Sequence, residues 1–428
     1  MSASASTATV EADTLMTVTG PVAPDKVPDG PLLCREWLLN DQSALLEQSD
    51  VAAAGLKPGD RVELSNLAAL RRWPRSCLHN LHLSIEDAVH ELAGPFRRQH
   101  GGALIVVCTP RAYWTADTPL QYASALQSLS QQASSALIVA STMPGPDLTP
   151  ATFELEVCRL VSDLAMGFEG SEQVRPGIIG ELVLWDPAAG AMPSEASTML
   201  RVCVEAQHRT GAPLLMSGPV SAEVFAILSG EAGVPGGNPC KWSKCAFFDV
   251  PHDSPVSPAQ LVDRGALLGF CPPSGGADLS RPLVGSHRTT GGRRPWRTEA
   301  EFLQAFAAAP RGQALISSGL RFRTEMVTGG GPGLDYILEL LMAAGAVDTA
   351  ALEELRSTAL KFLSYPWKPP PPPEEVIHTI ECHWCSRRVK QGDHFSKLAF
   401  DYCCPKCLSQ HRKVDFAPDK HGPPAEAK

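Results

Sequence analysis

The sequence predicts an α/β fold, a (β/α)8 barrel of the TIM type followed by a small module stapled by zinc. Between about residues 30 and 365, apolar runs of strand length alternate with amphipathic stretches, as a ring of buried parallel strands requires. A proline run ends this region, and a tight cluster of cysteines lies beyond it. A doubly wound sheet is the competing architecture, because the number of strands alone does not separate the two.

Eight strands are expected, and most are continuous apolar runs. A strand whose two faces are both covered needs such a run, whereas a half-exposed strand alternates apolar and polar residues. The expected strands are residues 31–39, 103–109, 136–142, 177–185, 213–218, 245–250, 266–272 and 314–320.

Several helices carry start and stop signals. The stretch from Ser84 has a cap residue and an acidic first turn, and Pro95 should bend or end it. A Thr-Pro pair at 149–150 is a good helix start. The stretches 194–211 and 333–345 both end on glycine, which is typical of a helix C-terminus.

Composition also divides the chain into regions. We expect a disordered lead-in at 1–16, the barrel at 17–366, a stiff proline-rich linker at 367–376, the zinc module at 377–416 and a polar tail at 417–428. A loop rich in Gly, Pro and Arg, residues 272–297, should follow the seventh strand, on the face where barrels keep their sites.

Charge and hydropathy narrow the function classes. The net charge of −9 makes nucleic acid an unlikely main partner. The sequence has no run of about 20 apolar residues that would span a membrane. The N-terminus lacks the basic and apolar regions of a secretory signal. These features predict a cytoplasmic protein, with association with the cytoskeleton or another large assembly left open.

The first strand contains the first candidate site residues. Cys34 and Glu36 are two positions apart, so a regular strand would place them on one face, with Arg35 between them on the other. Barrel enzymes often place a pair of metal ligands at this spacing.

The cysteine cluster is the strongest local signal. Cys382-x-x-Cys385 and Cys404-x-x-Cys407 have the spacing of two knuckles around one structural zinc ion. Cys403 is an alternative to Cys404, and His411 is a further possible ligand. A closed site of four ligands is structural, so we expect the module to contact a protein partner and to perform no catalysis.

Several stretches, taken in order, resemble the phosphotriesterase-related branch of the amidohydrolase-like barrels. They include "ELAGPFRRQHGGALIVVCTP", "MGFEGSEQVRPGIIGELVLW" with its "PGIIGE" core, and "TGGGPGLDYIL". The resemblance spans about 17–365 and favours the barrel. It implies a two-metal centre that activates a bridging hydroxide for hydrolysis.

The resemblance also assigns positions to that centre. Cys34 and Glu36 replace the His-x-His pair of strand one, and Glu181 keeps the bridging acid. The histidines of strands five and six fall on Ser217 and nearest Asp249, and the aspartate of strand eight falls on Gly319. Glycine cannot act as a base, so hydrolysis of the family type is not expected.

Two interpretations of the barrel mouth remain. In one, Cys34, Glu36, Glu181 and Asp249 hold a single cation such as Mn²⁺, Mg²⁺ or Zn²⁺ in a rewired hydrolase. In the other, the acids pair with Arg35 or with arginines of the 281–297 region and bind no metal. We expect the second: a catalytically degenerate barrel that serves as a binding or scaffold protein, with a small anion as a possible ligand of the mouth.

Overall fold

The computed structural model describes residues 13–96, 100, 103–116, 118–133, 136–145, 148–171, 173–230, 238–273, 296, 298–366, 379–386, 388–390, 395–397 and 400–417. The chain divides into two units, Met1–Lys368 and Pro369–Lys428. The predicted linker lies outside the described residues, as do 418–428 of the predicted tail and 274–295 of the predicted loop.

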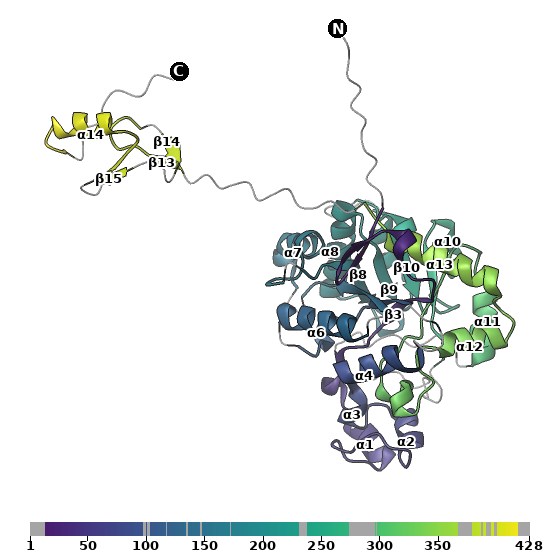
Figure 1. Cartoon of the computed structure of the whole chain (residues 1–428). Helices are drawn as coiled ribbons and strands as arrows, with labels where there is room; N and C mark the ends of the chain where they lie inside the picture. The colour runs from purple at the N-terminus through teal and green to yellow at the C-terminus, as the bar shows by residue number, and fades with distance from the viewer. Residues whose placement is uncertain are drawn as a thin grey trace, which may run out of the picture. The chain divides into compact units, whose positions relative to one another are not determined.

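Eight parallel strands form the centre of the first unit, in the order of the sequence from β3 to β12, and this confirms the predicted barrel (Figure 1). Each predicted apolar run coincides with one of them, and β8 begins one residue before its predicted run. The strands are β3 (Leu32–Glu36), β6 (Ala103–Val107), β7 (Ala136–Thr142), β8 (Pro176–Val183), β9 (Leu214–Ser217), β10 (Cys245–Phe248), β11 (Leu267–Phe270) and β12 (Ala314–Ile316).

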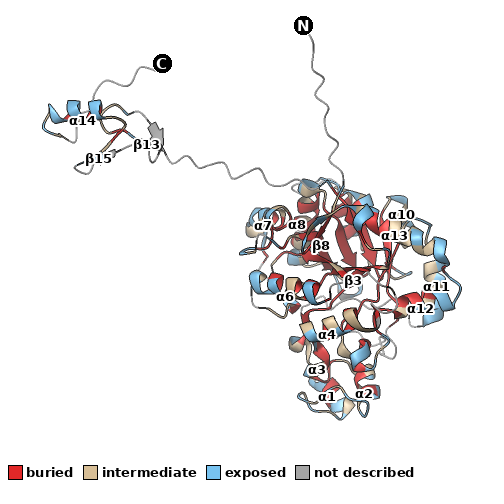
Figure 2. Ribbon diagram, in the orientation of Figure 1, coloured by how far each residue is buried: buried red, intermediate tan, exposed pale blue. Residues whose placement is uncertain are grey.

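Helices surround these strands, and burial is concentrated on the strands and on the inner helix faces (Figure 2). This pattern explains why the strands are apolar on both faces. The helices are α4 (Ile85–Glu91), α6 (Pro119–Gln132), α7 (Phe153–Met166), α8 (Ser194–Thr210), α9 (Ala222–Ser229), α10 (Pro258–Asp263), α11 (Glu299–Ala307), α12 (Tyr336–Ala343) and α13 (Thr349–Leu363).

The start and stop signals predicted for α4 and α8 lie at the ends of these helices. Ser84 and Asp87 form a capping box at the start of α4, and the helix gives way to a distorted turn, Leu92–Phe96, that contains Pro95. Gly211 ends α8 in the left-handed conformation that glycine adopts most easily.

The long segment after β3 forms small elements at one end of the barrel unit (Figure 1). They are β4 (Asn40–Asp41), α1 (Gln48–Ala54), α2 (Leu67–Arg72), α3 (Leu78–Leu81) and β5 (His82–Leu83). At the N-terminus, β1 (Leu15–Thr17) pairs with β2 (Gly20–Val22). Leu15 and Met16, which the sequence analysis placed in the lead-in, are therefore buried strand residues.

The described part of the second unit contains two pairs of short antiparallel strands and one helix. Strand β13 (Thr379–Glu381) pairs with β14 (Arg388–Lys390), and β15 (Phe395–Lys397) pairs with β16 (Phe400–Tyr402). Helix α14 (Pro405–Arg412) follows directly. Among the described residues of both units, no helix combines the length and the apolar character needed to cross a membrane.

Candidate functional site

An irregularity in β3 determines which side chains enter the barrel. The pairing of β3 with β6 shifts between Leu33 and Glu36, so the simple alternation of faces fails at this point. Cys34 packs in the interior cluster, and the guanidinium of Arg35 also reaches acids on β8 and just after β10.

Arg35 lies between two carboxylates in the barrel interior. Its Nη2 is 2.6 Å from Glu181 Oε1, and its Nη1 is 2.7 Å from Asp249 Oδ2. All three side chains are at most 1% exposed. Burial disfavours the charged guanidinium, but Glu181 and Asp249 outweigh this effect and hold the pKa of Arg35 well above its usual value. A cation that is part of the protein therefore compensates both acids.

Glu181 has further hydrogen-bond donors. Trp37 Nε1 donates to Glu181 Oε2 over 2.8 Å, and the Ser217 hydroxyl donates to Oε1. Ser217 occupies the position that the resemblance assigns to a histidine ligand. Both carboxylate oxygens of Glu181 thus accept hydrogen bonds from the protein itself.

Glu36 fastens the first barrel strand to the last. Its Oε1 accepts hydrogen bonds from the Ser317 hydroxyl and the Ser318 N–H, both over 2.7 Å, and from the Gly319 N–H. Its Oε2 accepts from the Leu320 N–H over 2.9 Å. Burial raises the pKa of Glu36 although these donors oppose the shift. Glu36 closes the barrel between β3 and β12.

We predict that Glu36→Ala lowers the free energy of unfolding by about 3 kcal/mol or more, because it leaves three buried backbone N–H groups without an acceptor. Urea unfolding followed by circular dichroism measures this loss. Glu63→Ala, at an exposed carboxylate, is the control and should change stability by less than about 0.5 kcal/mol. Equal losses in the two variants would show that Glu36 does not close the barrel.

The thiol of Cys34 is a poor metal ligand in this environment. Burial, with the nearby charge of Glu36, raises its pKa to about 12. Only the thiolate binds zinc or similar ions well, so this position offers a neutral thiol.

These residues do not fit the metal centre that the fold implies. The guanidinium of Arg35 lies where an ion shared by Glu181 and Asp249 would lie, and Glu36 is bound to the backbone after β12. Within the described part of the chain, the one group of three or more His, Cys, Asp or Glu side chains with converging ligand atoms is the C-terminal cysteine cluster. Cys34, Glu36, Glu181 and Asp249 do not form such a group.

The glycine-rich loop at 329–333 surrounds a carboxylate of the protein. Glu91 Oε1 accepts from the Leu334 N–H and Oε2 from the Val327 N–H, both over 3.0 Å. A Cβ at Gly333 would lie 2.3 Å from Glu91 Oε1, which explains the need for glycine there. A glycine-rich loop before a helix can bind an anion, and here the carboxylate of Glu91 takes that place.

Glu91 should make stability depend on pH. Burial raises its pKa from 4.5 to about 7 despite the two N–H donors. The folded state then binds a proton on Glu91 more tightly than the unfolded state does. The contribution of protonated Glu91 to the free energy of unfolding is therefore fully present below pH 4.5 and is lost as pH rises through 7. We predict that wild type loses about 3 kcal/mol across this window relative to Glu91→Gln. Glu339→Gln, at an exposed position on α12, is the control, and its free energy of unfolding should depend on pH as that of wild type does. If the pH dependence of Glu91→Gln were also the same as that of wild type, the raised pKa of Glu91 would be refuted.

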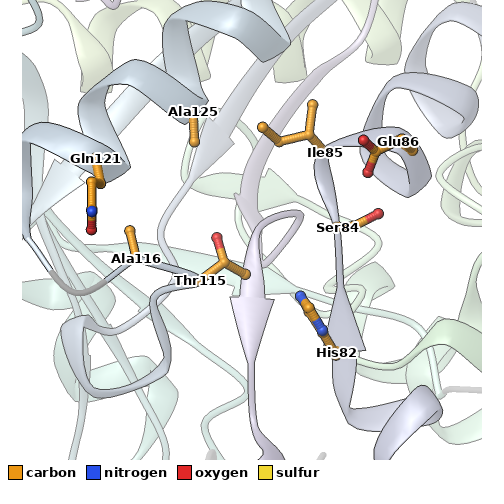
Figure 3. Close-up of a pocket in the computed structure, with 8 residues that line it drawn as sticks. All are labelled: His82, Ser84, Ile85, Glu86, Thr115, Ala116, Gln121 and Ala125. Atoms are coloured by element: carbon orange, nitrogen blue, oxygen red, sulfur yellow. The ribbon is translucent and has the colours of Figure 1, made fainter.

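Two of the sequence's histidines, His79 and His82, lie at the end of the barrel unit. His79 Nδ1 accepts from the Val62 N–H over 2.9 Å. His82 lines a pocket of about 410 Å³ between the starts of α4 and α6 (Figure 3). The pocket is lined by His82, Ser84, Ile85, Glu86, Thr115, Ala116, Gln121 and Ala125. None of the acids that pair with Arg35 takes part in it.

Four cysteines converge in the second unit. The Sγ atoms of Cys382, Cys385, Cys403 and Cys407 lie within 4.8 Å of one another, and two of the separations, Cys385–Cys403 and Cys403–Cys407, are 3.6 Å. Tetrahedral thiolates about 2.3 Å from a zinc ion lie about 3.8 Å apart. The cluster is therefore suited to zinc, and this confirms the predicted cofactor.

The cluster contains Cys403, where the sequence analysis preferred Cys404. Cys404 is the cap residue before α14, and its sulfur is 3.7 Å from Cys407. His411 lies outside the cluster, because its Nδ1 bonds the Tyr402 hydroxyl over 2.8 Å and its Nε2 bonds the Ala417 carbonyl over 2.9 Å. It belongs to the small aromatic core.

Comparison with known proteins identifies the folds of both units. Residues 378–419 match the model of the Vms1-associating treble clef domain. A resiniferatoxin-binding protein from Rhodobacter sphaeroides aligns with a TM-score of 0.63 and 20% identity, covering 82% of this chain and 94% of that one. The barrel has a phosphotriesterase-like fold.

Two further structures agree with this assignment. A phosphotriesterase homology protein from Escherichia coli, complexed with phosphate in its active site, aligns with a TM-score of 0.54 at 16% identity, over 78% of this chain and 99% of that one. The lactonase Lmo2620 from Listeria monocytogenes aligns with the same TM-score and identity, over 82% of this chain and 98% of that one. No curated protein matches the chain.

Proposed function

We propose that this chain is a binding or scaffold protein, built on a phosphotriesterase-like barrel without that fold's metal chemistry. The observation that carries the proposal is the position of Arg35, whose guanidinium forms ion pairs with both Glu181 and Asp249. A fixed cation does not bind or activate water as a metal ion does. The glycine at 319, where the resemblance expects an aspartate, supports the same conclusion.

The competing proposal is a metal-dependent hydrolase that uses Glu36, Glu181 and Asp249. A screen of carboxylic esters, lactones and phosphotriesters, with added Mn²⁺ or Zn²⁺, separates the two. We expect no hydrolysis above the rate of a Glu181→Gln variant. Hydrolysis by wild type that a chelator abolishes, and that Glu181→Gln lacks, would favour the hydrolase.

We further propose that the treble clef module contacts a protein partner of the Vms1 type. The domain model that it matches is named for association with Vms1. Its helix α14 presents exposed Lys406 and Arg412, followed by exposed Lys413, so an acidic surface on the partner would be complementary. Purified Vms1 should bind wild type and lose affinity for a Lys406→Glu/Arg412→Glu variant that keeps its zinc.

The proposed setting is the cytoplasm, within or beside a larger assembly. None of the thirteen cysteines forms a disulfide bond, which suits a reducing compartment.

A further inference from the structure

A second arginine of the barrel end remains incompletely paired. Arg321 follows Gly319 and Leu320 after β12, and its guanidinium carbon lies 4.7 Å from the ring centre of Trp37. The residue is 9% exposed. Its backbone is fixed, since its N–H donates to Glu325 Oε2 over 2.7 Å and its carbonyl accepts from Gln42 Nε2 over 2.7 Å. The side chain therefore starts from a rigid position.

Two hydrogen-bonding groups of the Arg321 side chain are not used by the described residues. Its Nε and Nη2 are buried and have no hydrogen-bond partner among the residues that the structure describes. Glu181 Oε1 is 4.0 Å from Nη2, which is beyond hydrogen-bonding distance, and that oxygen already accepts from Arg35 and Ser217. A buried N–H group without an acceptor is costly, so this edge of the guanidinium favours an acceptor from outside.

The geometry of the edge limits what that acceptor can be. Nε–H and Nη2–H point in parallel from one side of a guanidinium, and this fork matches two oxygens of a carboxylate or a phosphate. The one ion pair of Arg321 within the described residues is this 4.0 Å contact with Glu181, whose carboxylate also pairs with Arg35. The charge of Arg321 is therefore only partly compensated, and a second oxyanion would complete the pairing.

The surroundings of Arg321 fit a small ligand. Trp37 pairs with Tyr113, with ring centres 5.8 Å apart, and the two rings supply apolar surface beside the charge. Arg75, which is 7% exposed, also keeps its Nη2 without a hydrogen bond within the described residues, and Tyr113 lies within electrostatic range of it. Burial this deep excludes the surface of a macromolecule.

We propose that the barrel end binds a small-molecule oxyanion, a carboxylate or a phosphate, on the Nε–Nη2 edge of Arg321. The inference rests on the proposed binding function and gives it a ligand class. Trp37 holds the guanidinium plane, and Arg35 remains committed to its two acids. The ligand is bound without being transformed.

The test uses the full-length chain with inorganic phosphate and acetate as probes, at constant ionic strength set with sodium chloride. Selective ¹⁵N-arginine labelling makes the Nε–H signal of Arg321 visible, and Arg321→Gln assigns it. We expect one probe to shift this signal saturably and to raise the Tm by about 2 °C at a tenfold excess over Kd. A response to acetate alone identifies carboxylates as the class, and one to phosphate alone identifies phosphates.

Arg209→Gln provides the matched control. Arg209 lies on α8 and is already paired with Glu154 and Glu205, so its loss should leave the response to the probe unchanged, whereas Arg321→Gln should abolish it. An Nε–H signal of wild-type Arg321 that neither probe shifts would overturn the proposal even if Arg321→Gln fails to fold. If the hydrolase screen were negative as well, only the anion-site proposal would fail, and the proposed scaffold function would still stand.

Discussion

Replacing Arg35 with methionine should lower the free energy of unfolding by about 3–5 kcal/mol, because it removes the buried cation that forms ion pairs with both Glu181 and Asp249. The two carboxylates would then favour protonation, so the loss should be smaller at pH 5 than at pH 8. Chemical unfolding of wild type and Arg35→Met at both pH values measures the two effects.

Two further variants make this prediction specific. Arg209→Met removes an arginine whose ion pairs lie at the surface of α7 and α8, and it should cost less than about 1 kcal/mol. The triple change Arg35→Met/Glu181→Leu/Asp249→Leu should recover much of the lost stability, since an apolar cluster can replace a buried ion network. If Arg35→Met were as stable as wild type, Arg35 would not be the compensating cation.

Replacing Cys403 with serine should abolish zinc binding and unfold the C-terminal unit, while Cys404→Ser should keep both the zinc and the fold. A unit this small cannot bury enough apolar surface to fold without its metal. Zinc content and resistance of residues 379–417 to limited proteolysis are the measurements.

The barrel is the internal control for this pair, because its melting transition should be the same in both variants. Loss of zinc from Cys404→Ser with retention in Cys403→Ser would mean that Cys404 completes the site. Retention in both variants would mean that the two adjacent cysteines exchange as ligands.

The fold could be predicted because its signals are local. A buried strand such as Ala103–Val107 is apolar on both faces, and a capping box such as Ser84–Asp87 is visible in four residues. Most of the barrel strands contain runs of this kind, but a doubly wound sheet would contain them too. The resemblance to the phosphotriesterase-related barrels favoured the barrel over that alternative.

The candidate site was only partly predictable, because its geometry depends on pairing between strands. Glu181 and Asp249 were expected at the barrel mouth, and Arg35 was one of two proposed sources of compensation for them. The shift of β3 against β6, which brings Arg35 to these acids and Glu36 to the backbone after β12, has no signature in the sequence.

Two other features lay beyond sequence reasoning for related reasons. Cys403 and Cys404 are adjacent, so knuckle spacing cannot decide between them, and the start of α14 determines which sulfur faces the cluster. Arg321 and Glu91 act through long-range contacts with Trp37 and with the loop before α12. The one hint in the sequence was that Arg321 lies two positions after Gly319, which the resemblance places on the last barrel strand.

The central claim, that the barrel's cation is an arginine and the chain's metal belongs to the treble clef, is tested most directly by counting metal ions. Mass spectrometry on the intact full-length protein, purified from medium with added Zn²⁺ and Mn²⁺, should find one zinc per chain and none in a Cys382→Ser/Cys407→Ser variant. A metal ion that persists in that variant, and disappears when Glu181→Ala is added, would contradict the account and place a metal centre in the barrel.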